Sequence, residues 1–161
     1  MRLLLLLPLL VISISGASSL HPRNAFQGSY DMSRLVSASP ALRPHIIPAS
    51  SPRSKSGRPT IDFADAAAVR ALNAALLKAD YGVDDWALPP NKLCPPVPGR
   101  ADYVHVLADT LSLSAGAGRI PVGGNVVGLD VGTGASAVYA LIGVSRCPQT
   151  DEAGQEPDAS T

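Results

Sequence analysis

The residues with the clearest chemical potential form a short glycine-containing loop. Gly132, Thr133 and Gly134 follow Asp130 in the pattern D-x-G-x-G. Glycines in such a turn let the backbone approach a ligand, because a Cβ would hold the ligand away. A helix that begins directly after the loop adds a favourable field for a carboxylate or phosphate. The loop is therefore a candidate site for a nucleotide-like ligand, and a structural tight turn is the alternative that the pattern leaves open.

Two predicted elements would position this loop. Residues 126–131 form a short, β-branched apolar run that is typical of a strand buried on both faces. A helix is expected from about Ser136, with Val138, Leu141 and Ile142 as its apolar residues. Strand, turn and helix together are typical of the first unit of a nucleotide-binding α/β fold. The dinucleotide fingerprint is incomplete because Ala137 replaces its third glycine, a substitution that the pattern tolerates.

Two helices are predicted before this unit. The first begins after Asp65, whose carboxylate can cap it, and ends at Gly82, which suits a left-handed terminal position. Its apolar face consists of Val69, Leu72, Leu76 and Leu77. The second helix is expected over residues 100–113, with a buried face formed by Val104, Leu107, Ala108 and Leu111. A proline-rich connector joins the two.

The first 60 residues are basic and rich in proline and serine. Seven Lys or Arg and a single acid precede Ile61, although the whole chain has 13 basic and 13 acidic residues. Prolines at positions 40, 44, 48, 52 and 59 forbid a long helix, so residues 20–60 are expected to be largely flexible. Such a basic stretch can contact phosphate, but a simply solvated segment is the plainer interpretation.

Residues 1–19 are predicted to be a signal or targeting peptide. Arg2 precedes an apolar run at residues 3–14, and Ala17 and Ser19 provide the small side chains of a cleavage site. The run is too short to span a bilayer, so no stable membrane anchor is expected. An organellar transit sequence and a mis-assigned start are the alternatives. At the other end, residues 146–161 are expected to be a disordered tail, because the last eleven residues contain four acids and no apolar run.

No metal site is expected. The two cysteines, Cys94 and Cys147, are far apart, and no C-x-x-C or Cys/His ligand spacing occurs. His21, His45 and His105 are scattered along the chain.

Four segments, in order, resemble the bacterial 23S rRNA adenine-N6 methyltransferase family, which includes a eukaryotic relative acting on U6 snRNA. The segments are residues 20–24 (Leu-His-Pro-Arg-Asn), 61–78, 93–105 (with Cys-Pro-Pro-Val-Pro-Gly-Arg) and 129–143. The resemblance implies an S-adenosylmethionine-dependent, Rossmann-like α/β methyltransferase fold. Residues 61–121 would be its helical amino-terminal module, and residues 122–145 would be the first βα unit of the methyltransferase domain.

The resemblance also implies roles for individual residues. Asp130, Gly132, Thr133 and Gly134 would border S-adenosylmethionine, and Arg100 would reach the cofactor carboxylate in a bidentate way. The structural alternative for Arg100 is a helix-start residue paired with Asp102 or solvent. His21, Arg23 and Asn24 would lie on a module that faces RNA, expected to be rRNA; the alternative is a disordered tail.

The sequence also departs from the family. The family positions the target adenine with an Asn-Pro-Pro-Phe motif, which does not occur here: residues 89–91 have the reverse order, Pro-Pro-Asn. No catalytic residue is therefore assigned. Because the resemblance ends at about Ser145, we expect a chain truncated after the first βα unit. A single strand cannot bury both faces or pair its edges, so the unit over residues 126–144 is expected to be unstable. We expect a monomer. The alternatives to an intracellular methyltransferase are an inactive fragment that acts as a weak RNA-binding or interaction module, and a small secreted protein.

Overall fold

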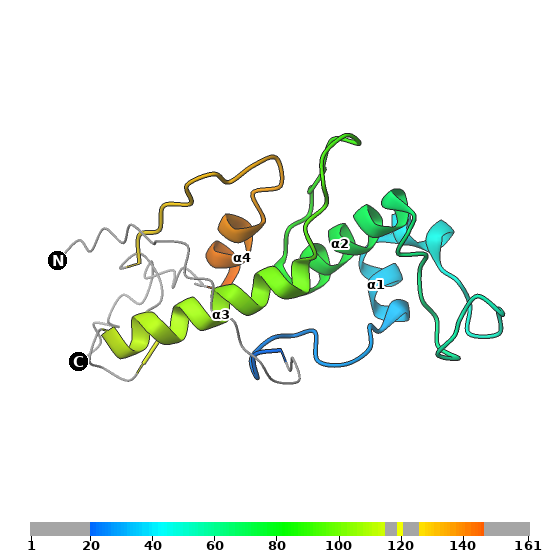
Figure 1. The fold of residues 1–161 in the computed structure, drawn as a ribbon, viewed down its shortest axis with the longest axis horizontal. Coiled ribbons are helices and arrows are strands. Elements are labelled where there is room, and N and C mark those ends of the chain that lie inside the picture. The colour runs from blue at the N-terminus through cyan, green and yellow to red at the C-terminus, as the bar shows by residue number, and fades with distance from the viewer. Residues whose placement is uncertain (1–19, 115–118, 121–125, 147–161) are drawn as a thin grey trace, which may run out of the picture.

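The computed structural model describes residues 20–114, 119–120 and 126–146. Within these ranges the regular elements are helices, joined by loops (Figure 1). The order is α1 (Met32–Ala38), the 3-10 helix η1 (Pro40–His45), α2 (Ala66–Tyr81), α3 (Val97–Ser114) and α4 (Val138–Arg146). The predicted leader and nearly all of the predicted tail lie outside the described residues. No helix within the described ranges is long and apolar enough to cross a membrane.

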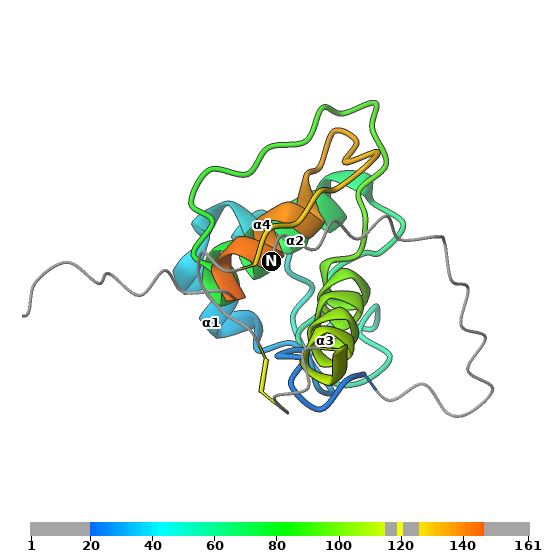
Figure 2. The ribbon, with the colours of Figure 1, turned by 90° about the vertical axis from the view of Figure 1, so that its left-hand side faces the viewer.

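Helix α2 lies at the centre and contacts the other four helices. Its predicted ends are confirmed: the Asp65 carboxylate accepts a hydrogen bond from the Ala67 N–H at 2.8 Å, and Gly82 adopts φ 64°. The predicted apolar face is buried at Leu72, Leu76 and Leu77, which are at most 2% exposed. Figure 2 shows α4 running alongside α2, with α3 seen along its axis.

The amino-terminal segment differs from the largely flexible chain predicted over residues 20–60. The Asp31 carboxylate caps α1 by accepting from the Arg34 N–H at 3.0 Å, and Leu35 and Leu42 are buried in the core. The prolines forbid one long helix but permit two short ones, because Pro40 stands in the first turn of η1, where a missing N–H costs nothing. An ion pair of 2.9 Å between Arg34 and Asp80 then joins α1 to α2.

The proline-rich insertion that follows is closed at its base. Ile47 and Thr60 form an antiparallel bridge with N···O distances of 2.7 and 3.0 Å. Within the loop, the buried Ser54 donates its hydroxyl to the Arg58 carbonyl at 2.6 Å. Local hydrogen bonds therefore give this segment the order that its composition did not predict.

Helix α3 begins three residues earlier than predicted, because its first N–H, at Val97, donates to the Asn73 side chain of α2 at 2.8 Å. The predicted buried face is wrong in register. The buried residues are Val97, Ala101, His105 and Ser112, whereas Val104, Leu107, Ala108 and Leu111 are only half-buried. Val97 and Ala101 belong to the main core cluster, whereas His105 is covered by the amino-terminal segment, whose His21 ring stacks on it. Helical periodicity does not show such long-range contacts.

The predicted strand at residues 126–131 is not formed in the structure. These residues make no β-ladder, and Val127, Leu129 and Val131 are 74–79% exposed. A strand needs a neighbour to accept its backbone hydrogen bonds, and no strand lies beside it among the described residues. Of the predicted βα unit, only the helix is present, and α4 begins at Val138 rather than near Ser136.

The central role of α2 gives a stability prediction. Leu77→Ala removes a side chain that is 0% exposed, and we expect a loss of about 2–5 kcal/mol in the free energy of unfolding. Leu113→Ala is the matched control, because Leu113 on α3 is 80% exposed; a loss of less than about 0.5 kcal/mol is expected there. Chemical denaturation of the full chain measures both, and equal losses would contradict the assigned core.

Candidate functional site

The two glycines of the loop have left-handed backbone conformations. Gly132 and Gly134 have φ values of 84° and 65°, in the left-handed region that glycine enters without strain. The Thr133 hydroxyl donates to the Asp130 carbonyl at 2.9 Å and closes the turn. A Cβ on Gly134 would meet its nearest neighbour at 3.8 Å, an ordinary contact. The glycines are thus required for conformation rather than for space within the described part of the chain.

Asp130 has an unsatisfied oxygen. Its Oδ2 atom is buried and has no hydrogen-bond partner among the described residues. A buried carboxylate oxygen without a donor is costly, and a bound ligand with hydroxyl or ammonium groups would satisfy it. S-adenosylmethionine offers both kinds of donor, so the residues present fit this cofactor.

Arg100 lies in the first turn of α3 and points to the start of α4. Its guanidinium carbon is 5.5 Å from the centre of the Tyr139 ring, in a cation–π contact. The alternative pairing with Asp102 is not formed, because the Asp102 carboxylate accepts from the His21 backbone N–H and from Asn24. The structure thus places Arg100 against the helix that follows the glycine loop.

Two features near the loop were not predicted from the sequence: the backbone conformation of Ala137 and the contact made by Trp86. Ala137 has φ 48°, a left-handed conformation that is strained for a residue with a Cβ. The preceding carbonyl, of Ser136, accepts a hydrogen bond from the Trp86 indole at 2.8 Å. Trp86 comes from the connector between α2 and α3, so no local pattern pairs it with this loop.

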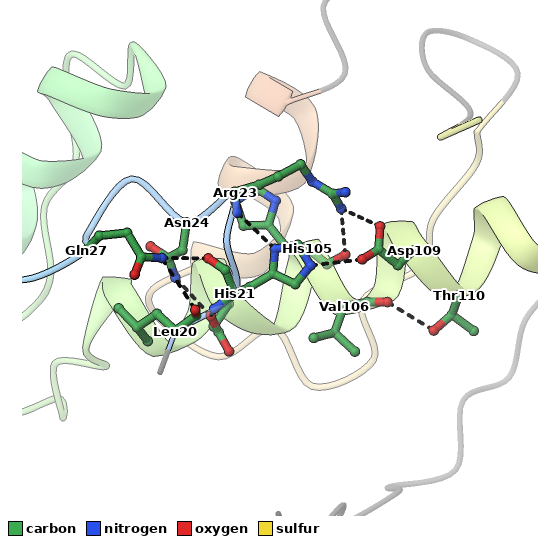
Figure 3. Close-up of polar contacts among 10 residues, drawn as sticks. Leu20, His21, Arg23, Asn24, Gln27, His105, Val106, Asp109 and Thr110 are labelled. Carbon is green, nitrogen blue, oxygen red and sulfur yellow. Dashed lines mark hydrogen bonds and ion pairs between the residues drawn. The ribbon is translucent and has the colours of Figure 1, made fainter. Parts of the chain in front are cut away.

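The three residues predicted to face RNA attach the amino-terminal segment to α3 in this structure, and we call this set of contacts the amino-terminal clamp (Figure 3). The Asp109 carboxylate lies 2.8 Å from His21 Nε2 and 2.6 Å from an Arg23 nitrogen. The His21 ring stacks on His105 with 5.3 Å between centres. Asn24 donates to the Pro98 carbonyl at 2.9 Å.

Exposure differs within the amino-terminal clamp. Asn24 is 3% exposed and the His21 side chain 14%, whereas the Arg23 side chain is 41% exposed. Arg23 is therefore the most exposed of the three, although its guanidinium pairs with Asp109. The RNA role assigned to the trio stays a prediction.

Charge in the amino-terminal clamp centres on Asp109. Hydrogen bonds from Arg23 and then His21 lower the pKa of the Asp109 carboxyl below its ordinary value.

Among the described residues no group of three His, Cys, Asp or Glu side chains is placed to hold a metal ion. Burial raises the pKa of the Cys94 thiol, which disfavours the thiolate that metals bind. Cys147 lies outside the described residues.

Solved structures share this fold. The chain superimposes on the METTL16 MTase domain with a TM-score of 0.64 and 32% identity, covering 81% of this chain and 47% of that one. A structure of the human METTL16 N-terminal domain in complex with SAH gives a TM-score of 0.62 at 32% identity, over 80% of this chain and 46% of that chain. These neighbours show that the fold is that of a methyltransferase domain. The described residues of this chain supply helices of that fold.

The sequence comparisons name the family. A family model described as RNA methyltransferase matches residues 14–148, so the chain belongs to this RNA methyltransferase family, as its motifs predicted. It is 50% identical over 127 residues to ribosomal RNA large subunit methyltransferase F of Pseudoalteromonas atlantica, covering 79% of this chain and 37% of the relative. The protein of that name from Pseudomonas entomophila is also 50% identical over 127 residues, or 38% of its length. The chain thus spans less than two fifths of these relatives.

The amino-terminal clamp gives a pH prediction. Because the pKa of Asp109 is lowered in the folded chain, its stabilising effect is present above the ordinary carboxyl pKa, about 4, and is lost as the pH falls through the lowered value. We expect Asp109→Asn to destabilise the chain and to speed amide exchange in residues 20–27 at pH 7. The difference from wild type should be full at pH 7 and should be lost at an acidic pH below the lowered pKa of Asp109.

Denaturation at the two pH values and hydrogen exchange measure these effects. Asp85→Asn is the matched control, because Asp85 is exposed and makes no ion pair within the described ranges. A difference of equal size at both pH values would show that the carboxylate charge is not what holds the segment.

Proposed function

We propose that this chain carries the cofactor loop and helical module of an S-adenosylmethionine-dependent RNA methyltransferase that acts on adenine N6 of ribosomal RNA. One observation carries the proposal above the others. A buried carboxylate oxygen of Asp130 lacks a donor beside a left-handed glycine loop, in a chain 50% identical to named ribosomal RNA methyltransferases.

Each proposed cofactor residue has a distinct binding task. Asp130 would accept hydrogen bonds from cofactor hydroxyl or ammonium groups, while the loop from Gly132 to Gly134 would lie against the methionine part. Arg100 would hold the carboxylate through two parallel N–H groups. The cofactor, when bound, supplies an electrophilic methyl group on sulfur. A neighbouring fold that carries SAH supports this choice of ligand.

RNA is the proposed substrate class. The curated relatives are named for ribosomal RNA, and a structural neighbour at 32% identity is a catalytic domain in complex with an RNA hairpin. In this chain Lys55 and Arg58 are exposed on the loop above the Ile47–Thr60 bridge. Their exposed side chains would contact phosphate, which gives affinity rather than sequence choice. We propose that the protein acts as a monomer, with residues 1–19 as its targeting peptide.

A second candidate is a binding module without catalysis. The 161 residues contain no Asn-Pro-Pro-aromatic sequence, so no side chain here is assigned to position the target amine. On this account the chain binds cofactor or RNA but transfers no methyl group. Incubation with radiolabelled S-adenosylmethionine and an adenine-containing RNA separates the two candidates, because only the first labels the RNA.

Calorimetry with SAH tests the cofactor site. We expect Asp130→Ala to weaken SAH binding by about tenfold or more, because the charged acceptor of at least one hydrogen bond is lost. The exposed Asp85 provides the control, and Asp85→Ala should bind SAH like wild type. Wild-type chain that shows no saturable binding of SAH, or an Asp130→Ala variant that binds it fully, would contradict the proposed site.

A further inference from the structure

We propose that Tyr139, supported by Tyr103, is a positioning residue that holds the Arg100 guanidinium ready for the carboxylate of the cofactor. We call these three side chains the aromatic bracket. The inference rests on the proposed function, because it needs a ligand whose carboxylate meets Arg100. It goes beyond that function by assigning a binding role to two tyrosines outside the glycine loop.

The geometry of the aromatic bracket comes from two helices. Arg100 and Tyr103 are three residues apart on α3, so their side chains lie on one face of the helix. Tyr139 is the second residue of α4. Its ring lies 5.5 Å from the Arg100 guanidinium carbon, and the Tyr103 ring meets it at 5.3 Å with 65° between the planes. Tyr139 thus contacts the guanidinium through its ring, and Tyr103 packs against Tyr139 in an edge-to-face arrangement.

The choice of an aromatic partner sets Arg100 apart from three other arginines. Arg23, Arg34 and Arg53 each pair with an aspartate, at distances of 2.5–2.9 Å. Arg100 makes no ion pair within the part of the chain that the structure describes. An aspartate would occupy the N–H groups and neutralise the charge, whereas a ring attracts the cation through its face and leaves the donors at the guanidinium edge available. Arg100 therefore keeps the N–H groups with which a guanidinium binds an external carboxylate.

Preorganisation is the physical benefit. An arginine side chain has several rotatable bonds, and fixing them on binding costs conformational entropy. A guanidinium already held over a ring loses less of this freedom when the ligand arrives. Stacking therefore improves affinity for the carboxylate end of the ligand and for no other part of it.

The aromatic bracket is also tied to the glycine loop. Tyr139 follows Ala137 by two residues, and the Leu141 N–H donates to the Ala137 carbonyl at 3.0 Å at the start of α4. The Trp86 indole fixes the preceding carbonyl, of Ser136. The position of the Tyr139 ring, and hence of the guanidinium, is therefore set by the same backbone that forms the loop.

Two ligands test this inference by calorimetry on the full chain. SAH carries the carboxylate, whereas 5′-methylthioadenosine has the same adenosine and thioether sulfur but lacks the amino-acid end, with both its carboxylate and its ammonium. We expect Tyr139→Leu to weaken SAH binding about three- to tenfold and to leave 5′-methylthioadenosine binding within about twofold. Tyr139→Phe keeps the ring face and should bind both ligands like wild type. Equal weakening of both ligands, or no weakening of SAH, would overturn the assigned role.

A ligand-independent measurement separates this inference from the proposed function. In the NMR spectrum of the unliganded chain, the Tyr139 ring should shift the Arg100 Nε–H resonance upfield. The shift should persist in Tyr139→Phe and disappear in Tyr139→Leu. If wild type binds neither ligand, the proposed function fails, and the bracket is judged on the NMR result alone. A shift that is absent from wild type, or unchanged in Tyr139→Leu, would refute the bracket.

Discussion

The burial of one face of α2 is the constraint on which the other elements depend. Leu72, Leu76 and Leu77 are at most 2% exposed, and every other helix in the described ranges contacts α2. The polar Asn73 of α2 determines where α3 attaches. This residue is 4% exposed, and its side chain donates to the Val69 carbonyl and accepts from the first N–H of α3. A buried amide with both groups satisfied fixes where α3 begins, because any other start would leave it without a partner.

The position of α3 in turn determines both sites. Its first turn presents Arg100 to α4, and its middle presents Asp109 to the amino-terminal segment. The two sites use opposite chemistry. Aspartates hold the basic amino-terminal residues in place, whereas a ring holds Arg100 and leaves its donors available. Helix α3 thus contacts one cation, Arg23, that has a structural role, and contributes another, Arg100, that is suited to bind a ligand.

The sequence could predict what local rules control. Asp65 and Gly82 marked the ends of α2, because capping depends on residues close in the chain. It could not predict that Asn24 packs against α3, 78 residues away from Asp102, or that Trp86 reaches Ser136. The buried face of α3 was mispredicted for the same reason, since the His21 ring covers His105 and the main core cluster includes Val97 and Ala101. The expected strand failed because strands depend on neighbours rather than on their own composition.

The central claim is that the glycine loop, the start of α4 and Arg100 form one ligand site. A titration of the ¹⁵N-labelled full chain with SAH, followed by NMR, tests it most directly. The account predicts saturable shifts concentrated in the amides of residues 130–139 and in the Arg100 side chain, with residues 31–47 unchanged. Shifts that do not saturate, or that centre on the amino-terminal clamp instead, would contradict it.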